Sequence, residues 1–385
     1  MEREGRPDIE FKAPNISEEP EVTPEQVEIA TKTLEDFLRL KPEESVVLIK
    51  DAATNPETAA ILKQAIERIG SAYTEVLIDK KTKKKDVNAL MKEHQVLMTL
   101  VTEHEGKLEG LYDGITKRGN RMAALFDLSP DAFKPGSAMT ENREELDARL
   151  NRMEAVLKEA AGFKITSEYG TNLEVGMRQF GERKWYKDSG AIDQPGIWSN
   201  LPGGEIFTTP DEGRVNGVLV LPALDTGISE HQGVDEFVRV HVKDGLIVEI
   251  EGGKSADTMR KQLEEDAKNE EKEGRNPNNA YRIAEIAFGA NSKARGVVAD
   301  VEQSYDAPAT PTIEAEKRFG TMHFAFGSSG HGAEGSDGFE RDTESHYDFV
   351  LPRNGLTVEM FNRYEDFKNQ KNGRKIINEG GINYA

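Results

Sequence analysis

The first part of the chain alternates apolar runs with segments of helical periodicity. Residues 45–50 and 73–78 are short and largely apolar, as expected for buried parallel strands. Between them, the segment 55–70 opens with Asn-Pro-Glu, which is typical of a capped helix start. Strands that alternate with helices predict a doubly wound, mostly parallel sheet. We therefore expect an α/β N-terminal domain over residues 23–162, preceded by a flexible acidic leader at residues 1–22.

The pattern of the chain changes near residue 163. Short segments such as 236–242 alternate apolar and polar residues, as half-buried strands do. Asp244-Gly245 separates two apolar runs, and this dipeptide is a strong hairpin signal. These features predict an α+β C-terminal domain rich in antiparallel strands over residues 163–385.

Candidate chemistry is concentrated in residues 320–350, which contain His323, His331 and His346. His323 lies in an apolar, strand-like run, and His331 lies in the glycine-rich loop that follows. In the next run, His346 and Asp348 are two residues apart, so a strand would place them on one face. Transition metals bind imidazole nitrogen together with carboxylate oxygen. This stretch therefore predicts a metal site.

Two glutamates have the setting that further metal ligands would need. Glu205 lies in NLPGGEIFTTP, residues 200–210, and Glu285 lies in RIAEIAFG, residues 282–289. A carboxylate within an apolar run is costly unless it is ion-paired or bound to a metal. Taken singly, Glu205 could be an ordinary turn residue and Glu285 an ion-paired one. Together they could supply the carboxylates that a pair of metal ions requires.

The order of four segments carries a family resemblance. NLPGGEIFTTP, AEIAFG, GTMHFAFG and HYDFV, between residues 200 and 350, resemble the metal-binding segments of the M29 family of metalloaminopeptidases. The resemblance covers mainly residues 163–385. It implies that two divalent metal ions, which could be Zn, Co or Mn, are bound by Glu205, Glu285, His323, His346 and Asp348.

The same resemblance implies a reaction. The chain would be a cytoplasmic, homodimeric metallohydrolase, an aminopeptidase that removes N-terminal residues from short peptides with a metal-activated bridging water. Glu205, Glu285 or His331 would transfer the proton. One position departs from the family, because Gly330 stands where the family usually has a tyrosine. His331 could take over that contact or could be a loop residue.

An alternative reading uses a single metal ion. Ring-opening dioxygenases of the 2,5-dihydroxypyridine type resemble the same family and also end in His-x-Asp. His323, His346 and Asp348 would then hold one Fe(II), and two histidines with one carboxylate leave positions open for oxygen and substrate. The presence of both glutamates favours the two-metal aminopeptidase. A non-peptidase relative on the same scaffold is a further alternative.

The amino-acid composition limits the kinds of molecule that the protein could bind. The formal net charge of −20 argues against nucleic acid or an anionic membrane, because phosphate binding needs a basic surface. The chain has no cysteine, which excludes disulfides, thiolate ligands and a cysteine nucleophile. Its first residues lack the apolar segment of a secretory signal. We therefore expect a short peptide or another small molecule as substrate, acted on in the cytoplasm.

Overall fold

The chain forms two units. The computed structural model describes residues 20–104, 107–177, 183–211, 213–221, 237–297, 310–329 and 345–384. Contacts divide the chain into a first unit, Met1–Pro135 with Ile192–Leu201, and a second unit, Gly136–Ala191 with Pro202–Ala385. This division falls earlier than the expected boundary at residue 162. The expected leader at residues 1–22 lies almost wholly outside the described residues.

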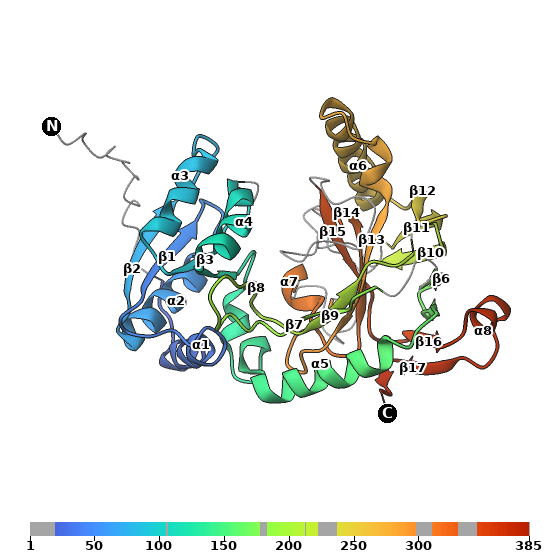
Figure 1. The fold of residues 1–385 in the computed structure, drawn as a ribbon, viewed down its shortest axis with the longest axis horizontal. Coiled ribbons are helices and arrows are strands. Elements are labelled where there is room, and N and C mark those ends of the chain that lie inside the picture. The colour runs from blue at the N-terminus through green and yellow to red at the C-terminus, as the bar shows by residue number, and fades with distance from the viewer. Residues whose placement is uncertain are drawn as a thin grey trace. The chain divides into compact units, whose positions relative to one another are not determined.

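The first unit is built on a parallel sheet with the strand order β2-β1-β3-β4-β8 (Figure 1). Its strands are β1 (Ser45–Lys50), β2 (Ala72–Leu77), β3 (Val96–Thr99), β4 (Arg121–Ala124) and β8 (Trp198–Asn200). Its helices are α1 (Pro24–Phe37), α2 (Pro56–Ile69), α3 (Lys84–Ala89), η1 (Leu90–Lys92), α4 (Glu109–Arg118) and η3 (Pro130–Phe133). The predicted α/β architecture is confirmed.

Local sequence explains where the first helices begin. The Thr23 hydroxyl accepts from the backbone N–H of Gln26, and the Gln26 side chain accepts from the backbone N–H of Thr23, so both members of a capping box are present. Asn55 caps α2 in the same way, and its side chain accepts from the backbone N–H groups of Glu57 and Thr58. Each cap satisfies backbone donors that the helix leaves unpaired.

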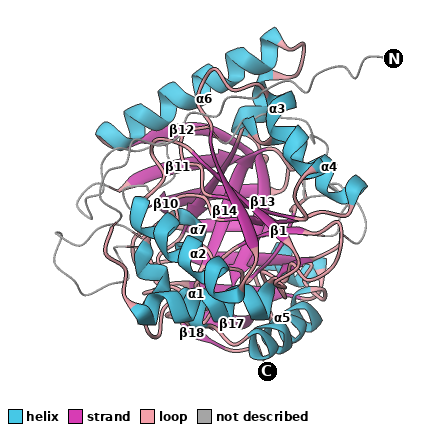
Figure 2. Ribbon diagram, turned by 90° about the vertical axis from the view of Figure 1, so that its left-hand side faces the viewer, coloured by secondary structure: helices cyan, strands magenta, loops and turns pink. Residues whose placement is uncertain are grey.

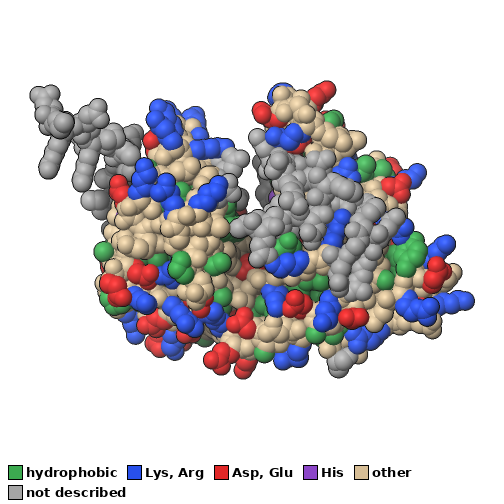
Figure 3. Space-filling view, in the orientation of Figure 1, with side chains coloured by type: hydrophobic (Ala, Val, Ile, Leu, Met, Phe, Trp, Pro, Cys, Tyr) green, Lys and Arg blue, Asp and Glu red, His purple; other side chains and the backbone are tan. Residues whose placement is uncertain are grey.

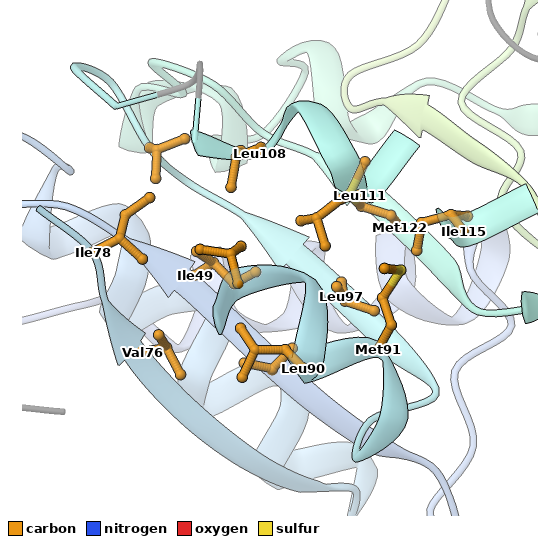
Figure 4. Packing of buried hydrophobic residues seen from close by; sticks show 13 residues of the cluster. Ile49, Val76, Ile78, Leu90, Met91, Leu97, Leu108, Leu111, Ile115 and Met122 are labelled. Carbon is orange, nitrogen blue, oxygen red and sulfur yellow. The ribbon is translucent and has the colours of Figure 1, made fainter. Parts of the chain in front are cut away.

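A hydrophobic core joins this sheet to α3 and α4 (Figure 4). Ile49 of β1, Leu97 of β3 and Met122 of β4 are fully buried together with Leu111 and Ile115 of α4. Full burial of one such side chain contributes roughly 1.5–3 kcal/mol. These contacts bury the helices against the sheet in one continuous core.

The second unit contains two antiparallel sheets. The larger one has the order β12-β11-β10-β6-β5-β16-β17-β18, and the smaller one has the order β15-β14-β13-β9-β7. The larger sheet comprises β5 (Gly162–Thr166), β6 (Asn172–Gly176), β10 (Val215–Leu221), β11 (Val238–Lys243), β12 (Leu246–Glu251), β16 (Thr357–Phe361), β17 (Arg374–Asn378) and β18 (Gly381–Ile382). The smaller sheet comprises β7 (Tyr186–Asp188), β9 (Glu205–Thr208), β13 (Ile283–Gly289), β14 (Met322–Gly327) and β15 (His346–Val350). The predicted antiparallel α+β domain is confirmed.

Helices and turns complete this unit. They are η4 (Ala138–Thr140), α5 (Arg143–Leu157), α6 (Lys254–Lys272), η5 (Pro277–Tyr281), α7 (Thr312–Ala315) and α8 (Tyr364–Asn369). Helix α6 contacts β11 and β12, as Figure 2 shows. The predicted hairpin between those strands is confirmed, because Asp244 and Gly245 have φ angles of 50° and 74°. Two positive φ angles in succession are typical of the tight hairpin turn that this dipeptide favours.

The two antiparallel sheets pack through aromatic rings. Phe163 of β5 and Phe288 of β13 have ring centroids 5.7 Å apart, and Trp185 lies 6.1 Å from Phe288. Phe288 belongs to the face of β13 that carries Ile286, and alternation turns Glu285 to the opposite face. Packing on one side of the smaller sheet therefore fixes the position of the charged side chains on its other side.

Surface charge and the length of apolar helices bear on whether a protein can bind nucleic acid or cross a membrane. On the face shown in Figure 3, acidic and basic side chains are interspersed. Among the described residues, no helix is both long and apolar enough to span a bilayer.

We expect the substitution Phe288→Ala to lower the free energy of unfolding by about 3–5 kcal/mol, because it leaves a cavity where two sheets meet. Guanidinium denaturation followed by circular dichroism measures this change. The matched control is Val248→Ala on β12, where the side chain is 60% exposed and the expected change is within about 0.5 kcal/mol. Equal effects of the two substitutions would contradict the packing described above.

Candidate metal centre

All five predicted metal ligands lie on one face of the smaller sheet. Strands β9, β13, β14 and β15 are neighbours, and β13 to β15 lie side by side in Figure 1. Because paired residues of antiparallel strands share a face, the register gathers the side chains of Glu205, Glu285, His323, His346 and Asp348. Small residues stand beside them: Ala287 pairs with His323, and Ala325 pairs with both Glu285 and Asp348. This face thus combines ligand atoms with little steric bulk.

The five side chains converge at short range. His323 Nε2 lies 3.1 Å from Glu285 Oε1, 3.3 Å from Glu205 Oε2 and 3.8 Å from Asp348 Oδ1. His346 Nε2 lies 3.4 Å from the same Asp348 oxygen and 4.0 Å from Glu285 Oε2. The Asp348 carboxylate therefore stands between the two imidazoles.

Unpartnered atoms in this cluster fit a bound cation. Within the described residues, Glu205 Oε2 and Asp348 Oδ1 are buried and make no hydrogen bond of good geometry, although His323 Nε2 lies 3.3 Å from the first and His346 Nε2 lies 3.4 Å from the second. A buried carboxylate oxygen without a donor costs free energy that a metal ion would recover. Two sets of side chains place one ligand atom each within 4.8 Å of one another, namely Glu205 with Glu285 and His323, and Glu285 with His346 and Asp348. The mixture of nitrogen and oxygen donors suits a divalent transition metal.

Hydrogen bonding prepares His346 for such a role. Its Nδ1 atom lies 2.8 Å from the backbone carbonyl oxygen of Ser328. A carbonyl oxygen only accepts, so Nδ1 carries a proton and Nε2 can turn its lone pair to the cluster when the ring is neutral. This hydrogen bond orients the ring, as hydrogen bonds to the second ring nitrogen do in metal-bound histidines.

The electrostatics of the cluster favour positive charge. Burial would lower the pKa of both imidazoles, but the neighbouring carboxylates raise it, to about 9 for His323 and to about 10 for His346. Burial would raise the pKa of Asp348, whereas His346 and His323 hold that pKa well below its usual range. The carboxylates thus outweigh desolvation, and a metal ion can replace the protons that the imidazoles otherwise hold.

Two charged residues of the centre, Glu316 and Lys317, were not predicted from the sequence. Lys317 is fully buried, and its Nζ lies 2.5 Å from Glu205 Oε1 and 2.6 Å from Glu316 Oε1. Burial would lower the pKa of Lys317, but Glu205 and Glu316 raise it well above its usual value. Glu316 also comes within metal-binding range of His323 and Asp348. In the sequence, these two residues belong to a charged run of the kind that is usually exposed to solvent. The only sign of a role in the site was that the run lies a few residues before His323.

Two glycines explain how Glu205 reaches the centre. A Cβ atom at Gly203 would lie 2.2 Å from the backbone nitrogen of Gly190. Gly204 has a φ of +126°, and a Cβ there would lie 2.9 Å from the backbone nitrogen of Asn291. Both positions require the absence of a side chain. The Gly-Gly pair before Glu205 therefore allows the close backbone packing that sets the start of β9.

The remaining candidates fall elsewhere. Gly330 and His331 lie outside the described residues, so the possible role of His331 stays a prediction. A further group, His241 with Glu249 and Glu251, lies on the β11–β12 hairpin, where both glutamates are exposed. Exposed cross-strand pairs of this kind contribute little and need no metal to explain them.

Comparisons with known proteins separate fold from activity. The solved structure of 2,5-dihydroxypyridine dioxygenase from Pseudomonas putida KT2440 superposes with a TM-score of 0.65 at 19% identity, over 94% of this chain and 98% of that one. Wild-type AmpT from Thermus thermophilus superposes with a TM-score of 0.61 at 15% identity, over 93% and 98%. At these identities both likenesses establish the fold alone, and the M29-type fold is confirmed.

Sequence comparison favours the dioxygenase over the aminopeptidase. A 2,5-dihydroxypyridine 5,6-dioxygenase from Pseudomonas putida KT2440 is 26% identical over 237 residues, which are 62% of this chain and 61% of that protein. The match thus spans about three fifths of that relative. The NicX family model, 2,5-dihydroxypyridine 5,6-dioxygenase, matches residues 26–361.

These findings overturn the expected activity. The predicted metallohydrolase, an M29 aminopeptidase acting on short peptides, is wrong, since both sequence comparisons name a dioxygenase. The error has a physical reason, because the types of ligand atoms in a sequence motif do not fix the number of metal ions or the reaction. With its family match running through both units, the chain belongs to the 2,5-dihydroxypyridine 5,6-dioxygenase family.

Proposed function

We propose that this chain is an Fe(II)-dependent dioxygenase that opens the ring of a dihydroxylated pyridine or a closely related aromatic compound. The observation that carries the proposal is the position of Asp348 between His323 and His346, in a chain that matches the family model over residues 26–361. Two histidines and one carboxylate are the usual protein ligands of non-haem ferrous iron in oxygenases.

Three residues of this chain would hold the metal: His323, His346 and Asp348. When bound by such a set, ferrous iron supplies the redox chemistry of oxygen activation and keeps positions open for oxygen and substrate. Both atoms of O₂ enter the product and one ring carbon–carbon bond breaks, so the overall reaction needs no external reductant. The homodimer remains a prediction.

The small residues of the sheet face would shape the substrate site. Ala287 and Ala325 stand among the ligand side chains and add little bulk of their own beside them.

Glu285 is the candidate proton acceptor. Its carboxylate lies 3.1 Å from His323 Nε2 and 4.0 Å from His346 Nε2, so it would be close to a hydroxyl of a ring bound at a metal ion that these histidines hold. Opening a dihydroxylated ring requires that a hydroxyl lose its proton, because the anion gives up electrons more easily. A positioned carboxylate contributes about 10²–10⁴-fold to such a step.

We expect protein reconstituted anaerobically with Fe(II) to consume one O₂ per molecule of 2,5-dihydroxypyridine, with loss of the ring's ultraviolet absorbance. His323→Ala should lower both bound iron and turnover by more than about 100-fold, since it removes a ligand rather than a supporting contact. The control His241→Ala changes a partly exposed hairpin histidine and should leave iron content and rate unchanged. Oxygen consumption that does not depend on 2,5-dihydroxypyridine, or full activity of the His323→Ala variant, would contradict the proposal.

The substitution Glu285→Gln tests the proton acceptor separately. The amide keeps the shape of the side chain but cannot take a proton, so we expect kcat to fall by about 10²–10⁴-fold while one iron per chain is retained. Stopped-flow kinetics and elemental analysis of the same sample measure the two quantities. An unchanged kcat would exclude Glu285 as the base, and loss of iron would assign it to the metal instead.

A further inference from the structure

We propose that Lys317 takes the place of a second metal ion and thereby makes this centre mononuclear. The inference rests on the proposed function, in which one Fe(II) is bound. Lys317 Nζ lies between two carboxylates, 2.5 Å from Glu205 Oε1 and 2.6 Å from Glu316 Oε1.

The ammonium group binds one oxygen of each of two carboxylates on which a second ion would depend. Glu205 belongs to one group able to hold a metal, with Glu285 and His323, and Glu316 belongs to another, with His323 and Asp348. Each group includes a carboxylate that Lys317 already binds. His346 and Asp348 make no such contact with Lys317 within the described residues, and they stay available to the first ion.

The backbone fixes Lys317 at this place. The backbone N–H of Asn291 donates to the Lys317 carbonyl at 2.7 Å, and the N–H of Phe319 donates to the Asn291 carbonyl at 2.8 Å. Gly289 ends β13, and a Cβ there would lie 2.1 Å from the carbonyl oxygen of Arg318. The segment that carries Lys317 thus packs directly on the strand that carries Glu285. A fully buried side chain held this way has no solvent-exposed alternative.

The test is the number of metal ions per chain, measured by elemental analysis after anaerobic reconstitution with excess Fe(II) and, separately, with Co(II). We expect one ion in the wild type, two in Lys317→Met, and one in Lys317→Arg, which keeps the charge. In the Co(II) form, magnetic coupling between two neighbouring ions distinguishes a true pair from a loosely bound extra ion. Lys317→Met combined with Glu205→Gln should return to one ion, because a carboxylate of the second group of ligands is gone.

Several results would overturn the inference. Two coupled ions in the wild type would do so whatever the variants show. A Lys317→Met protein with wild-type circular dichroism and a single ion would do so as well. If the Lys317→Met variant does not fold, the Lys317→Gln variant replaces it, because its amide can still donate to one carboxylate. A folded Lys317→Gln protein that binds a single ion would then overturn the inference.

Ring-cleavage assays keep the two proposals separate. One ion per wild-type chain without oxygen consumption would contradict the dioxygenase and leave the role of Lys317 standing. Ring cleavage by a wild-type chain that holds two coupled ions would contradict the role of Lys317 alone.

Discussion

The second unit must accommodate several carboxylates within one buried cluster, and much of its local structure serves that requirement. Glu205, Glu285 and Glu316 are each at most 6% exposed. Like charges at such distances repel strongly where water is excluded, so the site is stable only with cations among them. Lys317 is one such cation, and protons on the imidazoles or a metal ion supply the rest. The aromatic contacts behind the smaller sheet hold the strands in place against this repulsion.

Much of the fold could be predicted because its signals are local. The capping box at Thr23, the apolar run of β1 and the Asp244-Gly245 hairpin each depend on a few adjacent residues, and all three are present. The division between the units could not be found in this way. The periodicity of α5 predicts a helix, but not the strand on which it packs, and α5 contacts β9 of the second unit.

Part of the candidate ligand set could be named from the sequence because strands impose alternation, and the resemblance of four segments to a known family supplied the full set. His346 and Asp348 share a face for that reason, and the register then joins them to His323, Glu205 and Glu285. The activity could not be obtained from the same residues, because donor types do not fix the number of metal ions. The residue that we infer to fix it, Lys317, lies in a charged run outside the motifs. The backbone on either side of it, at Glu316 and Arg318, packs closely on Gly289, and sequence patterns do not reveal this contact.

The arrangement of the ligands on four strands also bears on how the protein matures. Glu205, Glu285, His323 and Asp348 are separated by long stretches of chain and meet only when β9, β13, β14 and β15 have paired. Contacts between residues so distant in sequence form late and slowly. Before these strands pair, the five side chains are not gathered, so a metal ion bound by several of them would be taken up after the sheet has assembled. Metal supply in the cell would then act on folded protein, as a step after synthesis rather than a guide to folding.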